Sequence, residues 1–437
     1  MHRRIMIPQL ASAPIQSPPQ TRAERGWLLF QGSGWYRAAR LLLWTVIATA
    51  GIRPTEVVGT GEQIAGVSLL QTSPIDLLFR CTVFVVCLST AFFALSARRV
   101  RVASLRFVPF LIWGVLVSVG QQSDLFSIKQ LGSYATWILF FISASALLDQ
   151  AADYATLRVV TVISVLTSAI AGVVQHALGY APMVGFIWEN VGFTRIHTGG
   201  GGILLDAFTP YCAALLLLAT SRNRPILQGG GVLLALWGSG NILRGGIVGF
   251  SVAMVWLLAV VPKGVKLNLL RGACASALLI GLCFGNKIIQ KSLSSGDEIN
   301  TSGRFEHWPE LVEWIRQEPL WGHGPNADMR LLEKGGGRGA FTVAHNEVLS
   351  TAVNYGIIGT VLLCYPLLTL LLRTLRLAYK HRRWRPEQLW GASAVLLMVA
   401  VLSLTDNTLR TPGVMILALA PVSVALNTRV YLRAKLA

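Results

Sequence analysis

Charged residues are scarce in this chain, and acidic ones are scarcer still. Of its 437 residues, 13% are charged and 53% are hydrophobic, with 38 Lys and Arg against 20 Asp and Glu. So little polar surface cannot cover soluble domains of this total length, so we expect the chain to use lipid as its solvent. The apolar runs are continuous rather than alternating, which excludes a β-barrel and predicts membrane-spanning helices.

Further absences narrow the function. No aromatic residues interleave with a basic stripe, so the net charge of +18 does not predict nucleic-acid binding. The N-terminus lacks the apolar core and cleavage site of a signal peptide. No glycine-rich stretch follows a strand, which argues against a nucleotide-binding loop. The six cysteines lie in or beside apolar runs, without zinc-ligand spacing or a disulfide framework.

The apolar runs predict about twelve spans. Their positions are 35–52, 77–95, 107–122, 131–148, 159–178, 203–219, 226–243, 245–261, 267–284, 348–372, 389–404 and 414–432. Several are shorter than the roughly 20 residues that cross a bilayer, so flanking polar residues are expected to be partly immersed. The predicted organisation is a cytoplasmic tail (1–35), nine spans (36–285), a long loop (286–346), and three spans with a cytoplasmic C-terminus (347–437).

Lys and Arg are distributed unequally between alternate connecting segments, as the positive-inside rule predicts. With the N-terminus in the cytoplasm, the inside segments hold most of the 38 basic residues, and both termini lie inside. This orientation places 180–202 and the long loop in the same outer compartment. In a bacterium that compartment is the periplasm, where no nucleotide pool drives group transfer.

The long loop contains a predicted amphipathic helix. Its apolar face comprises Phe305, Trp308, Val312 and Ile315, at near-helical spacing. Pro309 fits the first turn, and Glu318, Pro319 and Gly322 are expected to end the helix. A packing helix without a catalytic part is the alternative interpretation.

Two motifs flank this helix: Ser302-Gly303-Arg304 precedes it, and His345-Asn346 lies at the start of the next span. His345-Asn346, nine residues and then Gly356-Ile357-Ile358-Gly359 resemble the His-Asn-x9-Gly-x-x-Gly motif of O-antigen ligases and related protein O-oligosaccharyltransferases. With Gly303, Arg304, Trp308, Pro319, Gly322 and Gly324, they are similar to the characteristic block of the O-antigen ligase and O-antigen polymerase superfamily. The resemblance implies an all-α, polytopic, GT-C-like fold.

Two other arginines lie where this superfamily has arginines. Arg244 occupies the place of its Ser-Arg-Gly sequence at the end of a span, although the serine is missing. Arg195 lies in the place of its arginine and glycine stretch, although the Pro-Asn that usually follows is replaced by glycine-rich sequence.

The resemblance implies transfer of a glycan from undecaprenyl diphosphate to a hydroxyl of the lipid A core, at the periplasmic face of the bacterial inner membrane. A planar, permanently charged guanidinium suits phosphate oxygens, so Arg244, Arg304 and Arg195 are expected to hold the diphosphate. Histidines titrate near pH 6.5, which suits His345 to act as general base in an inverting displacement. The donor already contains an activated bond, so no cofactor is expected.

Three further residues are predicted to bind substrate. Asn346 either orients the imidazole of His345 or caps the following helix. Asp406, at the outer end of the eleventh span, either assists acceptor binding or pairs with Arg410. Arg338 in the long loop is the third.

A metal is not expected in this loop, because Asp297-Glu298 is not part of an Asp-x-Asp pair. His307 and His323 remain alternative ligands.

Two other functions stay open. An O-antigen or exopolysaccharide polymerase would use the growing lipid-linked chain as acceptor, and the sequence separates it poorly from a ligase. A flippase or transporter of lipid-linked glycan would more naturally show internal repeats and charges within several spans, which are not evident here. The motif spacing favours the ligase.

Overall fold

The computed structural model describes residues 33–52, 74–96, 102–121, 125–150, 152–177, 203–220, 225–240, 244–263, 304–334, 344–382 and 387–436, with isolated positions at 123, 266, 267 and 270. This part of the chain consists of α-helices and turns, with no strand, which confirms the predicted all-α class. The predicted ninth span, 267–284, lies almost wholly outside the described residues. Each of the other predicted spans coincides with a helix.

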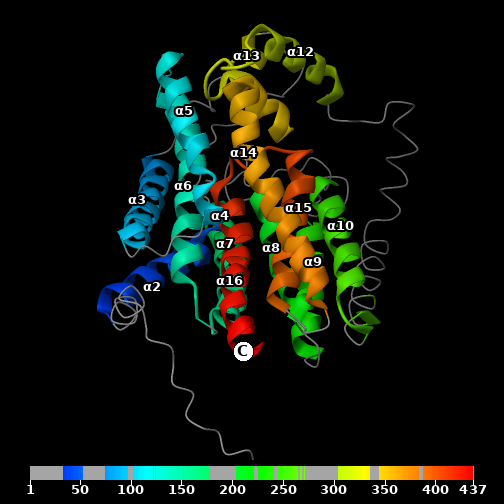
Figure 1. Cartoon of the computed structure of the whole chain (residues 1–437). Coiled ribbons are helices and arrows are strands. Elements are labelled where there is room, and N and C mark those ends of the chain that lie inside the picture. The colour runs from blue at the N-terminus through cyan, green and yellow to red at the C-terminus, as the bar shows by residue number, and fades with distance from the viewer. Residues whose placement is uncertain are drawn as a thin grey trace, which may run out of the picture.

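Figure 1 shows the arrangement of these helices. They are α2 (Gly34–Thr49), α3 (Pro74–Ser96), α4 (Val102–Leu105), α5 (Val108–Gly120), α6 (Leu125–Leu147), α7 (Asp153–Ala177), α8 (Ile203–Thr220), α9 (Pro225–Gly240), α10 (Arg244–Val260), α12 (Arg304–Gln317), α13 (Ala327–Lys334), α14 (Glu347–Lys380), α15 (Glu387–Ser403) and α16 (Pro412–Leu436).

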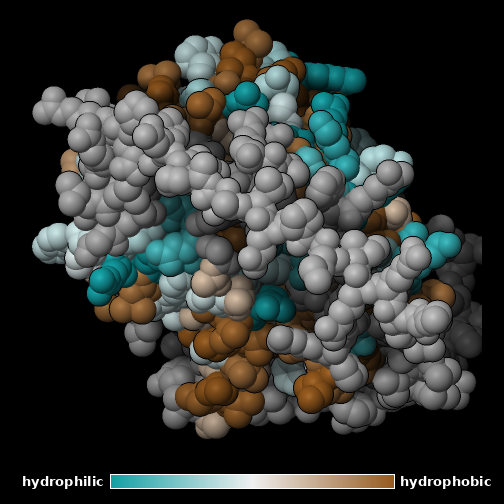
Figure 2. All heavy atoms as spheres, turned by 60° about the horizontal axis from the view of Figure 1, so that its bottom comes forward, coloured by the Kyte–Doolittle hydropathy of each residue, from teal (hydrophilic) through white to brown (hydrophobic). Residues whose placement is uncertain are grey.

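Five stretches among the described residues are long and apolar enough to cross a membrane. They are Leu77–Ser96, Val102–Gly120, Ile128–Leu147, Asp153–Val174 and Glu347–Lys380, and shorter apolar helices accompany them. Apolar side chains also stay exposed on the outer helices, for example Phe92 of α3 and Ile170 of α7, and on the face drawn in Figure 2 hydrophobic residues (brown) form patches among hydrophilic ones (teal). Such a surface suits lipid rather than water. The chain is therefore a multi-pass membrane protein, while the count of twelve spans stays a prediction.

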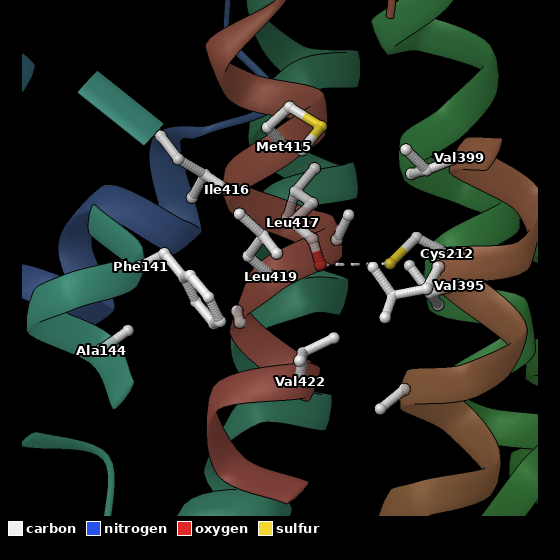
Figure 3. Close-up of a cluster of buried hydrophobic side chains, with 14 of the residues drawn as sticks. Phe141, Ala144, Cys212, Val395, Val399, Met415, Ile416, Leu417, Leu419 and Val422 are labelled. Atoms are coloured by element: carbon white, nitrogen blue, oxygen red, sulfur yellow. Dashed lines mark hydrogen bonds between the residues drawn. The ribbon is translucent and has the colours of Figure 1, made fainter. Parts of the chain in front are cut away.

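The core of the bundle lies between α6, α8, α15 and α16. The α16 helix packs against the other three, and α15 also packs against α10 and α14. In Figure 3, the Sγ atom of Cys212 (α8) points toward the carbonyl oxygen of Leu417 (α16) at 3.7 Å, beside Val395 and Val399 of α15. This apolar core fixes the ends of α15 and α16, between which Asp406 lies.

The α12 and α13 helices lie together at the end of the bundle away from the C-terminal end of α16 (Figure 1). Trp308, Leu311 and Ile315 of α12 pack toward α14, with Leu311 fully buried. The predicted amphipathic helix is thus confirmed, with two corrections. It begins at Arg304, so Pro309 falls in its second turn rather than its first. Val312 is 37% exposed, whereas Leu311 is buried; one 3.6-residue step from Trp308 falls between these two positions, and the packing against α14 selects Leu311.

The α14 helix is broken at Gly356, which has φ 68° and ψ −178°. The connection between α12 and α13 docks into this break: the Ile357 N–H donates to the Pro319 carbonyl (2.8 Å), and the Gly324 N–H donates to the Asn354 carbonyl (3.0 Å). A Cβ on Gly356 would lie 2.0 Å from the Leu320 carbonyl oxygen, so the position requires glycine. The glycines and proline of the motif block therefore join α14 to the segment that follows α12.

Candidate active site

The site is built where the start of α14 meets the segment between α15 and α16. Asn346 is the N-cap of α14, and its side-chain oxygen accepts from the N–H groups of Val348 (3.0 Å) and Leu349 (3.1 Å). This satisfies two of the unpaired N–H groups of the first turn. Its side-chain amide also donates to the Leu404 carbonyl (3.3 Å). Of the two interpretations of Asn346, capping is the one that the structure shows.

His345 contacts Asp406. Its Nδ1 lies 3.3 Å from Oδ1 of Asp406, and the two side chains are 25% and 18% exposed. The backbone of His345 has φ 45°, a region that non-glycine residues rarely adopt and that is common at functional sites. If the neutral imidazole donates its Nδ1–H to the carboxylate, Nε2 carries the lone pair that can accept a proton.

Arg410 is not the partner of Asp406, contrary to one of the sequence interpretations. It lies 2.6 Å from Asp328 of α13, whose carboxylate also accepts from the Ser350 hydroxyl (2.9 Å) and the Asn354 amide (3.0 Å). Burial alone would lower the pKa of Arg410, but the neighbouring Asp328 carboxylate more than offsets this and the pKa lies above its usual value. The sequence could not show this pairing, because Asp328 reaches Arg410 through tertiary packing.

Glu347 follows the His-Asn pair and is fully buried. It accepts from the Tyr134 hydroxyl of α6 (2.5 Å) and from the Leu409 N–H (3.1 Å). Three consecutive residues thus contact the segment between α15 and α16: His345 contacts Asp406, Asn346 contacts Leu404, and Glu347 contacts Leu409. Asn346 and Glu347 hold this segment on both sides of Asp406, and so fix the carboxylate against His345.

Two of the predicted arginines start helices at this end of the bundle, and only their backbones are described. Arg244 is the first residue of α10. The next residue, Gly245, packs so closely that a Cβ there would lie 2.6 Å from Oγ1 of Thr405. The start of α10 therefore lies beside the residue before Asp406.

Arg304 is the first residue of α12. One turn later, Trp308 donates its Nε1–H to the carbonyl of Ala344 (3.1 Å), the residue before His345. The residue after Arg244 thus packs against Thr405, and a residue one turn after Arg304 contacts Ala344, so both helices touch residues adjacent to the His345–Asp406 pair. Arg195 and Arg338 lie outside the described residues.

A groove of about 700 Å³ opens between α12 and the first turn of α14. Its lining is mostly apolar and comprises Trp308, Pro309, Val312, Arg316, Asn346, Val348, Leu349 and Leu404. Because Asn346 belongs to this lining, the groove leads to the residue next to His345.

Of the two histidines considered as metal ligands, only the side chain of His323 is described. Nε2 of His323 lies 2.8 Å from the Trp314 carbonyl oxygen. Within the described ranges, no group of three or more His, Cys, Asp and Glu side chains is placed to hold a metal ion.

Sequence reasoning missed Glu347, Tyr134 and Asp328. Glu347 had a usable signal, because an acidic residue at the start of an apolar span is costly unless it is paired or functional. Tyr134 and Asp328 had none, since their partners lie far away in sequence.

The fold and this polar end define a multi-pass, all-α membrane protein with a histidine–carboxylate pair beside an apolar groove. Residues 212–364 match the family model described as O-antigen ligase. The matched stretch includes His345, Asn346 and the glycines at the break in α14, and it confirms the resemblance to the O-antigen ligase and polymerase superfamily. Members of this family are glycosyltransferase-type enzymes. No curated protein matches the chain.

Proposed function

We propose that the protein is an O-antigen ligase, which transfers O-antigen polysaccharide from undecaprenyl diphosphate to a sugar hydroxyl of the lipid A core, at the periplasmic face of the inner membrane. The observation that carries this proposal is the His345–Asp406 contact at the polar end of the bundle, next to which α10 packs on Thr405 and α12 contacts Ala344. Transfer from a lipid diphosphate needs a base for the acceptor, cations for the diphosphate and room for a lipid, and each has a candidate here.

In the proposed reaction, the acceptor hydroxyl gives its proton to Nε2 of His345 as its oxygen bonds to the anomeric carbon of the donor. The bond between that carbon and the phosphate oxygen breaks, and its electrons leave with undecaprenyl diphosphate. A single displacement inverts the anomeric centre. Asp406 orients the imidazole and stabilises the imidazolium that forms, as the carboxylate of a catalytic triad does.

The arginines have the task of binding the diphosphate. Negative charge on the departing phosphate grows as the bond breaks, so guanidinium groups from Arg244 and Arg304 would stabilise the transition state more than the bound donor. Arg195 and Arg338 are assigned to substrate binding by the resemblance and the loop sequence alone. The mechanism needs neither a nucleotide nor a metal.

The groove beside α14 supports a lipid-linked donor. Trp308, Val312 and Leu349 give it an apolar lining that suits an isoprenoid segment. A lipid in this groove would contact Asn346, which is the residue next to the proposed base, His345.

Purified protein supplied with undecaprenyl diphosphate-linked O-antigen and lipid A core tests the proposal. Transfer is expected without nucleotide and with a chelator present. Failure of folded protein to transfer glycan between these two substrates would contradict the activity, and a strict requirement for a divalent metal would contradict the mechanism.

A polymerase is the second candidate, because the matched family covers both activities. Lipopolysaccharide from a strain lacking the gene separates them on a gel. A ligase predicts polymer that persists on undecaprenyl and is missing from the core. Core that carries one repeat unit would instead indicate a polymerase, and unaltered lipopolysaccharide would exclude both assignments.

A further inference from the structure

The segment between α15 and α16 contains a buried amide without a partner. Asn407 directly follows Asp406 and is 8% exposed, yet among the described residues neither its side-chain oxygen nor its side-chain nitrogen has a hydrogen-bond partner. Buried polar groups are nearly always hydrogen-bonded, because leaving one unpaired is costly. Asn407 leaves both a donor and an acceptor unpaired.

Its neighbours share this property. Within the described part of the chain, Oγ1 of Thr408, which is fully buried, and Nε of Arg410 also lack hydrogen-bond partners. Unpaired polar atoms therefore gather on the 407–410 segment, immediately after the carboxylate that contacts His345.

The backbone around Asn407 is nevertheless well fixed. The N–H of Asp406 donates to the Leu402 carbonyl (2.7 Å), and the N–H of Asn407 donates to Oδ1 of Asp406 (2.8 Å). On the other side, Leu409 is held by Glu347, and its carbonyl accepts from Nε1 of Trp137 (3.0 Å). A fixed backbone with unpaired side chains is the arrangement of a preorganised binding site.

The chemistry of the amide restricts its ligand. A phosphate oxygen only accepts hydrogen bonds and would leave the Asn407 oxygen unpaired, whereas a cation would leave the nitrogen unpaired. Neighbouring sugar hydroxyls both donate and accept, so they can satisfy the two ends of one amide. The segment 407–410 directly follows Asp406 and so adjoins His345, which in the proposed reaction receives the proton of the acceptor hydroxyl.

We propose that Asn407 binds two neighbouring hydroxyls of the acceptor sugar and so holds the attacking hydroxyl at His345. This inference rests on the proposed function. The hydroxyl of Thr408 extends the same site.

The test compares Asn407→Ala with the wild-type protein in the transfer assay, with each substrate varied separately. The KM for the lipid A core is expected to rise about tenfold, the scale of one or two neutral hydrogen bonds, while the KM for the donor stays unchanged. The thermal midpoint in detergent should stay the same or rise, because the substitution removes unpaired buried groups. Asn407→Ser, which is small and polar, serves as the second variant if the alanine protein does not fold.

Asn427 provides a matched control, since it is also buried but its amide donates to the carbonyls of Ser145 (3.1 Å) and Leu148 (2.7 Å). Asn427→Ala should lower the thermal midpoint and leave both KM values unchanged. If Asn407→Ala behaves in the same way, the amide is a structural group that binds water only, and the inference is wrong. A rise in the donor KM alone also overturns it. Absence of transfer by wild-type protein contradicts the proposed function itself.

Discussion

Breaking the ion pair between Asp328 and Arg410 should destabilise the protein more than removing both partners. The Asp328 side chain is 0% exposed and that of Arg410 is 11% exposed. Asp328→Leu leaves the guanidinium buried without its carboxylate, and leaves Ser350 and Asn354 without their acceptor. Breaking such a pair costs about 3–5 kcal/mol, whereas replacing both partners with apolar residues of similar volume is often nearly neutral.

The assay is thermal unfolding in detergent of the wild-type protein, Asp328→Leu, Arg410→Met and the double variant. The structure predicts a lower midpoint for each single variant and partial recovery in the double variant. The interaction energy from this double-mutant cycle should exceed about 1 kcal/mol. Two single losses that simply add would refute the reasoning, because they would mean that the two charges do not depend on each other.

Three more predictions concern the same end of the bundle. Gly356→Ala should lower the thermal midpoint strongly, because its Cβ would lie 2.0 Å from the Leu320 carbonyl oxygen; Gly132→Ala, with nothing within 4 Å, is the control, and equal midpoints would contradict the docking of the loop. Glu347→Ala should reduce kcat more than Glu347→Gln, because the glutamine keeps one oxygen that can accept from Tyr134 or Leu409. Equal kcat values for both variants and the wild-type protein would show that Glu347 is not needed to position the segment that contains Asp406. Since the pKa of Arg410 lies above its usual value, its contribution to stability is fully present below the ordinary pKa of an arginine side chain. The midpoint difference between wild type and Arg410→Met should therefore stay constant from neutral to mildly alkaline pH, and a difference that shrinks over this range would contradict it.

The sequence predicts the helices well because a spanning segment carries its own apolar signal. The amphipathic α12 helix and the cap at Asn346 were also predictable, since both depend on residues within one or two turns. The resemblance marked Gly322 and Gly356 as motif residues. That they meet, with the loop docked in a break of α14, is visible in the structure alone.

Partners that depend on tertiary packing could not be predicted. Glu347 and Tyr134 are 213 positions apart in the chain, so no local pattern links them. The sequence allowed Asp406 either to pair with Arg410 or to assist acceptor binding. In the structure Asp406 contacts His345 instead of Arg410, and a role in acceptor binding stays a prediction. Leu311 was missed on α12 because one helical period from Trp308 falls between positions 311 and 312, and only tertiary packing against α14 decides which of the two is buried.

The central claim is that His345 accepts the proton of the acceptor hydroxyl. The most direct measurement is the rate of glycan transfer from undecaprenyl diphosphate to lipid A core by the wild-type protein and by His345→Ala, at saturating substrates and matched thermal stability. His381→Ala, altered at the C-terminal end of α14, controls for the loss of a histidine. A general base contributes about 10²–10⁴-fold, so the account predicts a loss of that size in His345→Ala and none in His381→Ala. Full activity of folded His345→Ala would contradict it.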